Sequence, residues 1–322
     1  GGDFTNNGSA TIDTTTGTEY DSTAGQGGLV WFKMRNAGFS HRLIDTERGV
    51  TKKLETTNDA AEGTEAEGLK AFNANGFIVG SHDNYNLNNY NFVSWTFRKA
   101  PKFFDIVTYT GNGSNRAINH NLGGTVGWLV VKRTDGSGNW FVLDVGTGKR
   151  GYFDYTSAAF SSSSGLFFGD GSSYQAPTST QFFISSNGNI NTNGSEYIAY
   201  LFAHNNNDGE FGPNSDQDII KCGSYTGNTS TKPTIDLGFE PQWLMLKNVS
   251  SANQDWHIVD TMRGLYNGTG VSGSGGVQDA RLRPNTNSAE ETTFGIIDIT
   301  PTGFKIGPDN LDETNKNGDT II

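Results

Sequence analysis

Three aspartates could do chemistry, because each ends a short apolar run and they recur along the chain: Asp45, Asp144 and Asp260. Two carboxylates on either side of a bound sugar would form the active site of a glycoside hydrolase. Such a site normally occurs once, whereas this Asp is repeated together with the sequence around it. The pattern favours a structural role, in which each Asp caps a turn or pairs with an arginine such as Arg48 or Arg263. A catalytic or ion-binding Asp is the alternative.

The other residue types with catalytic or metal-binding chemistry are scattered. No two of the five histidines have a metal-ligand spacing on a helix, and His41 stands where two related segments have Trp140 and Trp256, so we expect it to fill space in a strand. The acidic stretch 309–313 could bind calcium through oxygen atoms, but it lacks the order of an EF-hand loop, and a solvated loop is favoured. No nucleophile elbow or phosphate-binding loop is present. We therefore predict no enzyme activity, no catalytic residue, no metal site and no cofactor.

Composition excludes several classes of protein. The 322 residues include 23 Lys and Arg against 34 Asp and Glu, for a net charge of −11. A nucleic-acid-binding protein needs a basic surface to neutralise phosphates, and none is present. The apolar runs are far shorter than the roughly 20 residues that cross a bilayer, so no membrane segment or signal peptide is expected in this sequence. The single Cys222 excludes an internal disulfide framework.

The elements that would position these residues are short strands. Aromatic residues make up 12% of the chain and lie in short apolar runs bounded by Gly and Asn. This pattern argues against disorder and is typical of an all-β protein rich in loops. We predict tandem antiparallel β-sandwich domains of the jelly-roll or lectin-like kind.

Three copies of one unit organise the chain. Each copy opens with an apolar run that ends in Lys, and a second run that ends in the recurring Asp follows. Alignment on Trp31, Trp128 and Trp243 gives a repeat of roughly 100 residues, long enough for a domain with its own core. The opening runs are 29–33, 128–132 and 243–247, and the second runs are 41–45, 140–144 and 256–260.

Proline and turn residues separate the copies. One boundary lies at Ala100-Pro101 and the other in the Asn- and Gly-rich stretch 205–213. The predicted domains are 1–101, which includes 1–27 as a leader or upstream linker, 102–208 and 209–322.

The first and third copies look incomplete beside the second. An aromatic strand closes copies one and two, at 92–97 and 197–202, whereas copy three reaches only Ile322, the match of Ile198. We therefore expect copy three to be truncated at its closing strand and the sequence to be a piece of a longer polypeptide. An opening element precedes copies two and three, at 105–113 and 219–228, and has no convincing match before Trp31. Copy one would draw this strand from upstream chain or from residues 1–27.

Recognition would fall to the segments that differ between copies. The tryptophans recur in register with the fold, so we expect them in the core rather than exposed to sugars. The inserts 155–174 and 265–281 vary most, and variable loops on a rigid scaffold commonly carry binding. The candidate receptor contacts are Tyr155, Tyr174, Tyr266 and Arg281.

One stretch of the sequence resembles a known family. The run 95–113, WTFRKAPKFFDIVTYTGNG, together with 120–123 and 130–135, is similar to a domain of unknown function that recurs in structural proteins of cyanophages and other marine tailed phages. The segment 44–49, IDTERG, resembles the L-x-D-T-x-R-G of the same family, from which copy two departs at 145–148. The resemblance spans most of residues 27–322.

This resemblance implies a viral structural protein, part of a tail fibre, tailspike or capsid-attached fibre, that acts in host attachment. It implies a place on an extracellular appendage of the virion, among other virion structural proteins, with host surface glycans as candidate partners. Fibre proteins commonly trimerise, so a homotrimer is the expected assembly. A monomeric carbohydrate-binding or decoration module on a virion or bacterial surface is the alternative, and a polysaccharide-degrading tailspike is less favoured. No nucleic-acid or membrane partner is expected.

Overall fold

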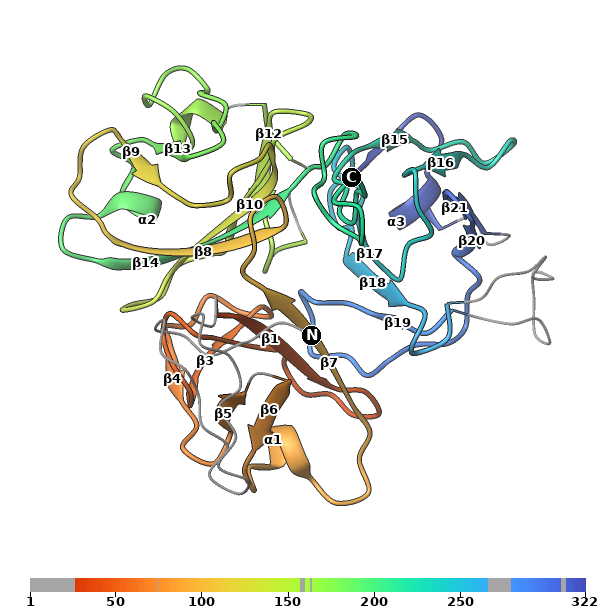
Figure 1. The fold of residues 1–322 in the computed structure, drawn as a ribbon, viewed down its shortest axis with the longest axis horizontal. Coiled ribbons are helices and arrows are strands. Elements are labelled where there is room, and N and C mark those ends of the chain that lie inside the picture. Colours follow the sequence, from red (N-terminus) through yellow and green to blue (C-terminus); the bar gives the residue numbers. More distant parts are fainter. Residues whose placement is uncertain (1–26, 74, 157–159, 163, 266–278, 308–310) are drawn as a thin grey trace.

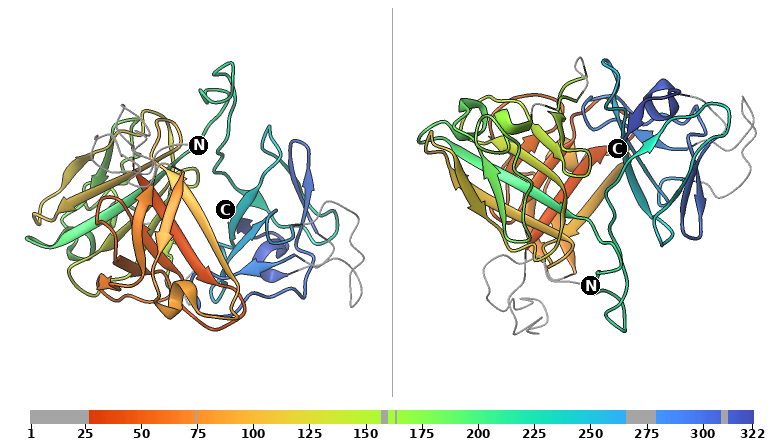
Figure 2. Two further views of the ribbon diagram at one scale, coloured as in Figure 1. Left: turned by 60° about the horizontal axis from the view of Figure 1, so that its bottom comes forward. Right: turned by 90° about the horizontal axis from the view of Figure 1, so that it is seen from above.

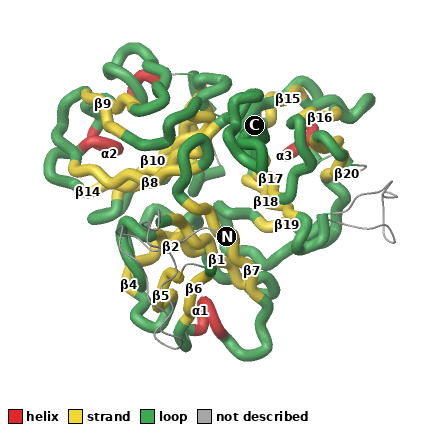
Figure 3. The backbone as a smooth tube through the Cα atoms, in the orientation of Figure 1, coloured by secondary structure: helices red, strands yellow, loops and turns green. Residues whose placement is uncertain are grey.

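The structure is a computed structural model that describes residues 27–322 except 74, 157–159, 163, 266–278 and 308–310 (Figure 1). Its elements are short strands and single-turn helices joined by loops (Figure 3). Neighbouring strands in the described residues pair antiparallel, as in the first two sheets. The predicted all-β fold is confirmed.

Copy one forms a five-stranded sheet with the order β4-β3-β2-β1-β7. The strand β1, which lies between β2 and β7, is buried along its whole length, as its apolar run predicts. A hairpin and a short helix cover one face. The elements are β1 (Gly28–Met34), β2 (Arg42–Asp45), β3 (Lys52–Glu55), β4 (Gly63–Thr64), β5 (Leu69–Asn73), β6 (Gly76–Val79), α1 (Asp83–Asn86) and β7 (Phe92–Arg98).

Copy two forms the matching sheet β12-β11-β10-β14-β8, in which β8 adds a strand outside the closing strand β14. The small sheet β13-β9 and the helix α2 lie beside it (Figure 1). The elements are β8 (Phe104–Thr110), β9 (Arg116–Asn119), β10 (Val126–Arg133), β11 (Phe141–Asp144), β12 (Lys149–Tyr152), the 3-10 helix η1 (Ser164–Leu166), β13 (Gln181–Ile184), α2 (Gly188–Asn191) and β14 (Glu196–Ala203).

Copy three repeats the pattern with shorter strands. Its sheets are β17-β18-β19, β16-β21-β20 and β15-β22, and β22 meets the end of β17 where Lys247 and Ile322 exchange two backbone hydrogen bonds of 2.9 Å. The elements are β15 (Tyr225–Thr226), β16 (Thr234–Asp236), β17 (Trp243–Lys247), β18 (Trp256–Asp260), β19 (Arg281–Leu282), β20 (Ile297–Thr300), β21 (Gly303–Ile306), α3 (Asp312–Asn315) and β22 (Thr320–Ile321).

The strand registers correct the alignment of the first copy. Asp45 pairs with Leu29, whereas Asp144 pairs with Trp128 and Asp260 with Trp243. Leu29, not Trp31, is therefore the counterpart of the other two tryptophans. A shift of two residues leaves a side chain on the same face of a strand, so the apolar pattern alone does not distinguish the two alignments.

The three copies share one central hydrophobic cluster. Trp256 of copy three lies 6.0 Å from Trp128 and 5.0 Å from Phe153 of copy two, measured between ring centroids. Phe153 in turn lies 5.8 Å from Trp31 of copy one. The cluster draws further members from all three sheets, and separate outer clusters lie within the copies. The copies form three lobes around this centre (Figures 1 and 2). The domain boundaries at residues 101 and 208 remain a prediction from the sequence.

Hydrogen bonds from one strand position join each copy to the next. Trp140 of copy two donates its Nε1 proton to the carbonyl of Glu55 at 2.9 Å, and Trp256 of copy three donates to the carbonyl of Tyr152 at 3.2 Å. His41 holds the equivalent position in copy one and is fully buried, as expected of a space-filling residue. Its Nδ1 accepts a hydrogen bond from Trp31.

Candidate functional site

The recurring Asp of copy one organises the turn after β2. Its Oδ1 accepts hydrogen bonds from the backbone N–H groups of Glu47 (3.1 Å) and Arg48 (3.0 Å). Its Oδ2 receives the Arg48 side chain at 2.7 Å and the Tyr200 hydroxyl, from copy two, at 2.8 Å. Asp45 is fully buried, and its charge is compensated by Arg48.

Copy three repeats this arrangement. Asp260 Oδ1 accepts the backbone N–H of Arg263 at 2.9 Å, while its Oδ2 receives the Arg263 Nε at 2.6 Å and the Nε1 of Trp95, from copy one, at 3.0 Å. Arg263 also pairs with Glu290 at 2.9 Å, and Glu290 with Arg35 at 2.6 Å. The carboxylate thus ties the first copy to the third.

Asp144 has no arginine partner among the described residues, and its turn is the one that departs from the D-T-x-R-G pattern. Its Oδ2 accepts the backbone N–H of Thr147 at 2.9 Å and the Thr147 hydroxyl. Burial raises the pKa of Asp144. In each copy the fourth residue after the Asp is a glycine at a positive φ, which other residues adopt only with strain. These glycines are Gly49 (92°), Gly148 (65°) and Gly264 (119°). The contacts in all three turns support the structural interpretation of the aspartates.

A second recurring group, not singled out in the sequence, is the lysine that ends each opening run. Lys33, Lys132 and Lys247 are at most 1% exposed. Lys33 Nζ donates to the carbonyls of Met34 (2.6 Å) and Ala37 (3.1 Å), and the other two also donate to backbone carbonyls. Burial lowers the pKa of each to about 8. The sequence did carry a signal for this group, because a lysine ends the opening apolar run of every copy.

Replacing Lys247 with methionine is expected to change how stability depends on pH. Because burial lowers the pKa of Lys247 from 10.5 to about 8, the unfolded chain binds more protons than the folded chain between those two values. The contribution of Lys247 to the free energy of unfolding is therefore lowest below about pH 8 and rises through this window. Urea denaturation of the wild type and of Lys247→Met at several pH values measures the difference between their free energies of unfolding. Titratable groups that the two proteins share contribute equally and cancel in this difference.

We expect the wild type to gain stability relative to Lys247→Met as the pH is raised. The matched control is Lys70→Met, at a side chain that is 41% exposed, for which the difference should stay flat. A flat difference for Lys247→Met as well would show that this lysine keeps its charge in the folded protein as easily as in water.

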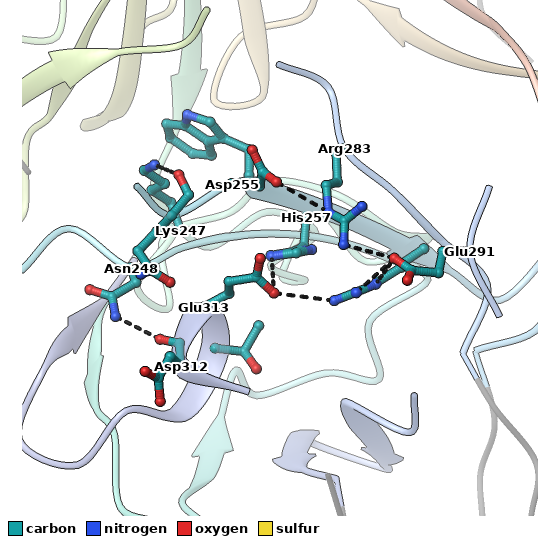
Figure 4. Close-up of polar contacts among 12 residues, drawn as sticks. Lys247, Asn248, Asp255, His257, Arg283, Glu291, Asp312 and Glu313 are labelled. Carbon is teal, nitrogen blue, oxygen red and sulfur yellow. Dashed lines mark hydrogen bonds and ion pairs between the residues drawn. The ribbon is translucent and has the colours of Figure 1, made fainter. Parts of the chain in front are cut away.

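A charged network in copy three joins α3 to β18 and β19 (Figure 4). His257 Nε2 and Arg281 Nη1 each lie 3.4 Å from Glu313 Oε2. Arg281 and Arg283 share Glu291 Oε2 at 2.7 Å. Hydrogen bonding from His257 lowers the pKa of Glu313 to about 2, and burial lowers that of His257. Among the described residues, each acid of this network is paired with a base.

The calcium alternative for the acidic stretch fits these contacts poorly. Glu313 is engaged by His257 and Arg281, and Asp309 and Asn310 lie outside the described residues. Among the described residues, no three or more His, Cys, Asp or Glu side chains are grouped so that they could hold a metal ion.

The four candidate receptor contacts have different environments. Tyr155 is 51% exposed, and Tyr174 is half-buried with a hydroxyl that has no hydrogen-bond partner among the described residues. Tyr266 lies outside the described residues. Arg281 is only 3% exposed and is held by Glu291 and Glu313, so it offers no surface to a receptor, contrary to expectation. In the sequence, Arg281 alternates with apolar residues. This local pattern gave no sign that Glu291 and Glu313 would pair with it inside the protein.

In the parts of the chain that the structure describes, no helix has the length and apolarity needed to cross a bilayer.

Comparison with known proteins gives a family but no function. No curated protein and no solved structure matches the chain. The model of one family, "Domain of unknown function (DUF7483)", matches residues 1–322. The chain therefore belongs to the DUF7483 family.

Proposed function

We propose that this protein is a structural component of a tailed-phage virion, in a tail fibre, tailspike or capsid-attached fibre, with a role in host attachment. The observation that carries the proposal is the central cluster, which joins three β-copies through aromatic contacts and buried hydrogen bonds. Two of the three repeated carboxylates, Asp45 and Asp260, accept hydrogen bonds from another copy. The likeness of residues 95–113 to a domain of marine phage structural proteins supports the phage setting.

A stiff module of this kind suits an extracellular appendage. The copies share an aromatic core, and buried ion pairs hold their turns. Local unfolding should therefore cost much free energy in most of the module. Such a body can present variable loops to a cell surface without losing its shape. We expect it to assemble as a homotrimer with other virion proteins.

Immunogold electron microscopy tests the location. Antibodies raised against the purified protein should label one appendage of virions whose genome encodes this chain, and serum pre-absorbed with the protein should not. Label over infected cells but not over purified virions would refute the structural role.

The second candidate function, a carbohydrate-binding module, is favoured by Tyr155, which is 51% exposed in the insert of copy two and lies 6.0 Å from the Tyr152 ring. Exposed aromatic rings give sugars an apolar face to stack on. Labelled protein should bind host cells and compete with phage adsorption, and Tyr155→Ala should weaken both effects. Equal binding by Tyr155→Ala and the wild type would show that this loop does not take part in recognition.

A further inference from the structure

One strand position connects the three copies in a cyclic order. Trp140 of copy two donates to the backbone of copy one, and Trp256 of copy three donates to the backbone of copy two. His41 holds this position in copy one, and the backbone of Arg283, in copy three, faces its ring. We call these three contacts joints.

The strand registers show that the joints are equivalent. In its own copy, each contacted residue directly follows the strand partner of position 43, 142 or 258. The contacted residues are Glu55, Tyr152 and Arg283. The joint at His41 is the weakest in hydrogen bonding, because no acceptor in the described chain lies in good geometry to its Nε2.

Trp31 fixes the protonation state of His41. Trp31 Nε1 lies 3.0 Å from His41 Nδ1, and an indole nitrogen can only donate, so Nδ1 is the acceptor and carries no proton. The His41 ring is 0% exposed and stacks on Trp95, with 6.3 Å between the ring centroids. A protonated ring would point a second N–H group at the indole N–H and lose this hydrogen bond.

The charged groups that face His41 are cations. They are Lys33 on β1, Arg42 on β2 and Arg263 in the turn after β18. Burial, and then these positive charges, hold the pKa of His41 well below its ordinary value of 6.5.

The carboxylates on this side of the joint already have partners. Asp260 and Glu290 pair with Arg263 at 2.6 and 2.9 Å. The second fully buried histidine of the described chain, His257, differs because Glu313 lies 3.4 Å from its Nε2. A positive charge would therefore have a counter-ion at His257 but none at the joint between copies one and three.

We propose that His41 makes the joint between copies one and three an acid-sensitive switch. Protonation of Nδ1 breaks the hydrogen bond from Trp31 and places a charge among cations, so copy one separates from copy three at this joint. The other two joints use tryptophan, which does not titrate, and they stay closed. The switch does not depend on the phage assignment.

The working pH range follows from proton binding in the closed and open states. In the open joint His41 is solvated and titrates near 6.5, whereas in the closed joint it binds a proton only at lower pH. The stabilisation from this joint is therefore complete above about pH 6.5 and is lost as the pH falls below that value. Between pH 7.5 and 5.0 the equilibrium constant for opening should rise about 30-fold.

Hydrogen exchange at single-residue resolution measures this opening, because backbone hydrogen bonds cross between the copies. The amide of Glu290 donates to copy one at 2.6 Å, that of Glu62 to copy two at 2.8 Å and that of Phe160 to copy three at 3.0 Å. After correction for the intrinsic effect of pH on exchange, Glu290 should lose about 30-fold of its protection between pH 7.5 and 5.0. Glu62 and Phe160 should change by less than about threefold.

His41→Gln is the test variant, because glutamine can accept from Trp31 and donate toward copy three but does not titrate in this range. It should abolish the acid response of Glu290. The matched control is His257→Gln, which should leave that response intact. If His41→Gln does not fold, His41→Trp, which places the residue of the other two copies at this joint, serves instead.

Two results would overturn the proposal. One is an equal acid response of Glu290 in the wild type and the folded His41 variant. The other is an equal loss of protection at all three amides of the wild type. Asp154 also titrates in this range, because burial raises its pKa to about 6, but it works in the opposite direction: the folded protein binds its proton more tightly, so acid stabilises that site.

Discussion

Replacing Trp256 with alanine is expected to lower the free energy of unfolding by about 3–5 kcal/mol. The side chain is 1% exposed, and its ring packs against Trp128, Phe153 and Phe160 of copy two. Its Nε1 also donates to the backbone of the same copy at Tyr152. The substitution therefore opens a cavity where copies two and three meet and removes a hydrogen bond between them.

The loss should extend beyond copy three. If the central cluster joins the copies, urea denaturation will show one weakened transition, and hydrogen exchange will show lost protection in strands of copies one and two as well. Met262→Ala is the matched control, since this side chain is 90% exposed and its loss should change stability by less than about 0.5 kcal/mol. Lost protection confined to residues 243–282 would instead indicate three independent domains.

Local patterns were enough to predict the strands and turns. Unbroken apolar runs gave β1 and β10, and the Asp at the end of each second run predicted a capped turn, which the contacts of Asp45 and Asp260 bear out. Both features depend on residues close together in sequence. They arise from the alternation of side chains along a strand and from hydrogen bonds between Asp and the nearby backbone. Both can therefore be predicted from the sequence alone.

Features set by distant residues could not be predicted in the same way. Trp31 looked like the counterpart of Trp128 because a two-residue shift keeps the same strand face. Arg281 looked like a surface residue because its partner Glu313 lies on α3, far along the chain. The shared cluster depends on how the copies pack, and a repeat of roughly 100 residues is equally consistent with separate domains.

Arg263→Met is expected to destabilise the protein by about 3–5 kcal/mol, because it leaves the buried carboxylate of Asp260 without its counter-charge. Arg263 binds Asp260 at 2.6 Å and Glu290 at 2.9 Å, and its side chain is 1% exposed. The Arg263 guanidinium also lies over the Trp95 ring, 5.2 Å from its centroid. Methionine keeps most of the apolar stem and removes the charged group with these contacts. Chemical denaturation near neutral pH measures it.

Adding Asp260→Asn to this variant should recover part of the loss, because the unpaired charge is then gone while the hydrogen bond from Trp95 can be kept. The matched control is Arg133→Met, which breaks an ion pair with Asp135 whose side chains are 30% and 34% exposed and should cost less than about 1 kcal/mol. If Arg263→Met costs no more than Arg133→Met, the buried Asp-Arg turn does not hold copies one and three together. A large loss with partial recovery would show that the recurring aspartates stabilise the fold by connecting its copies.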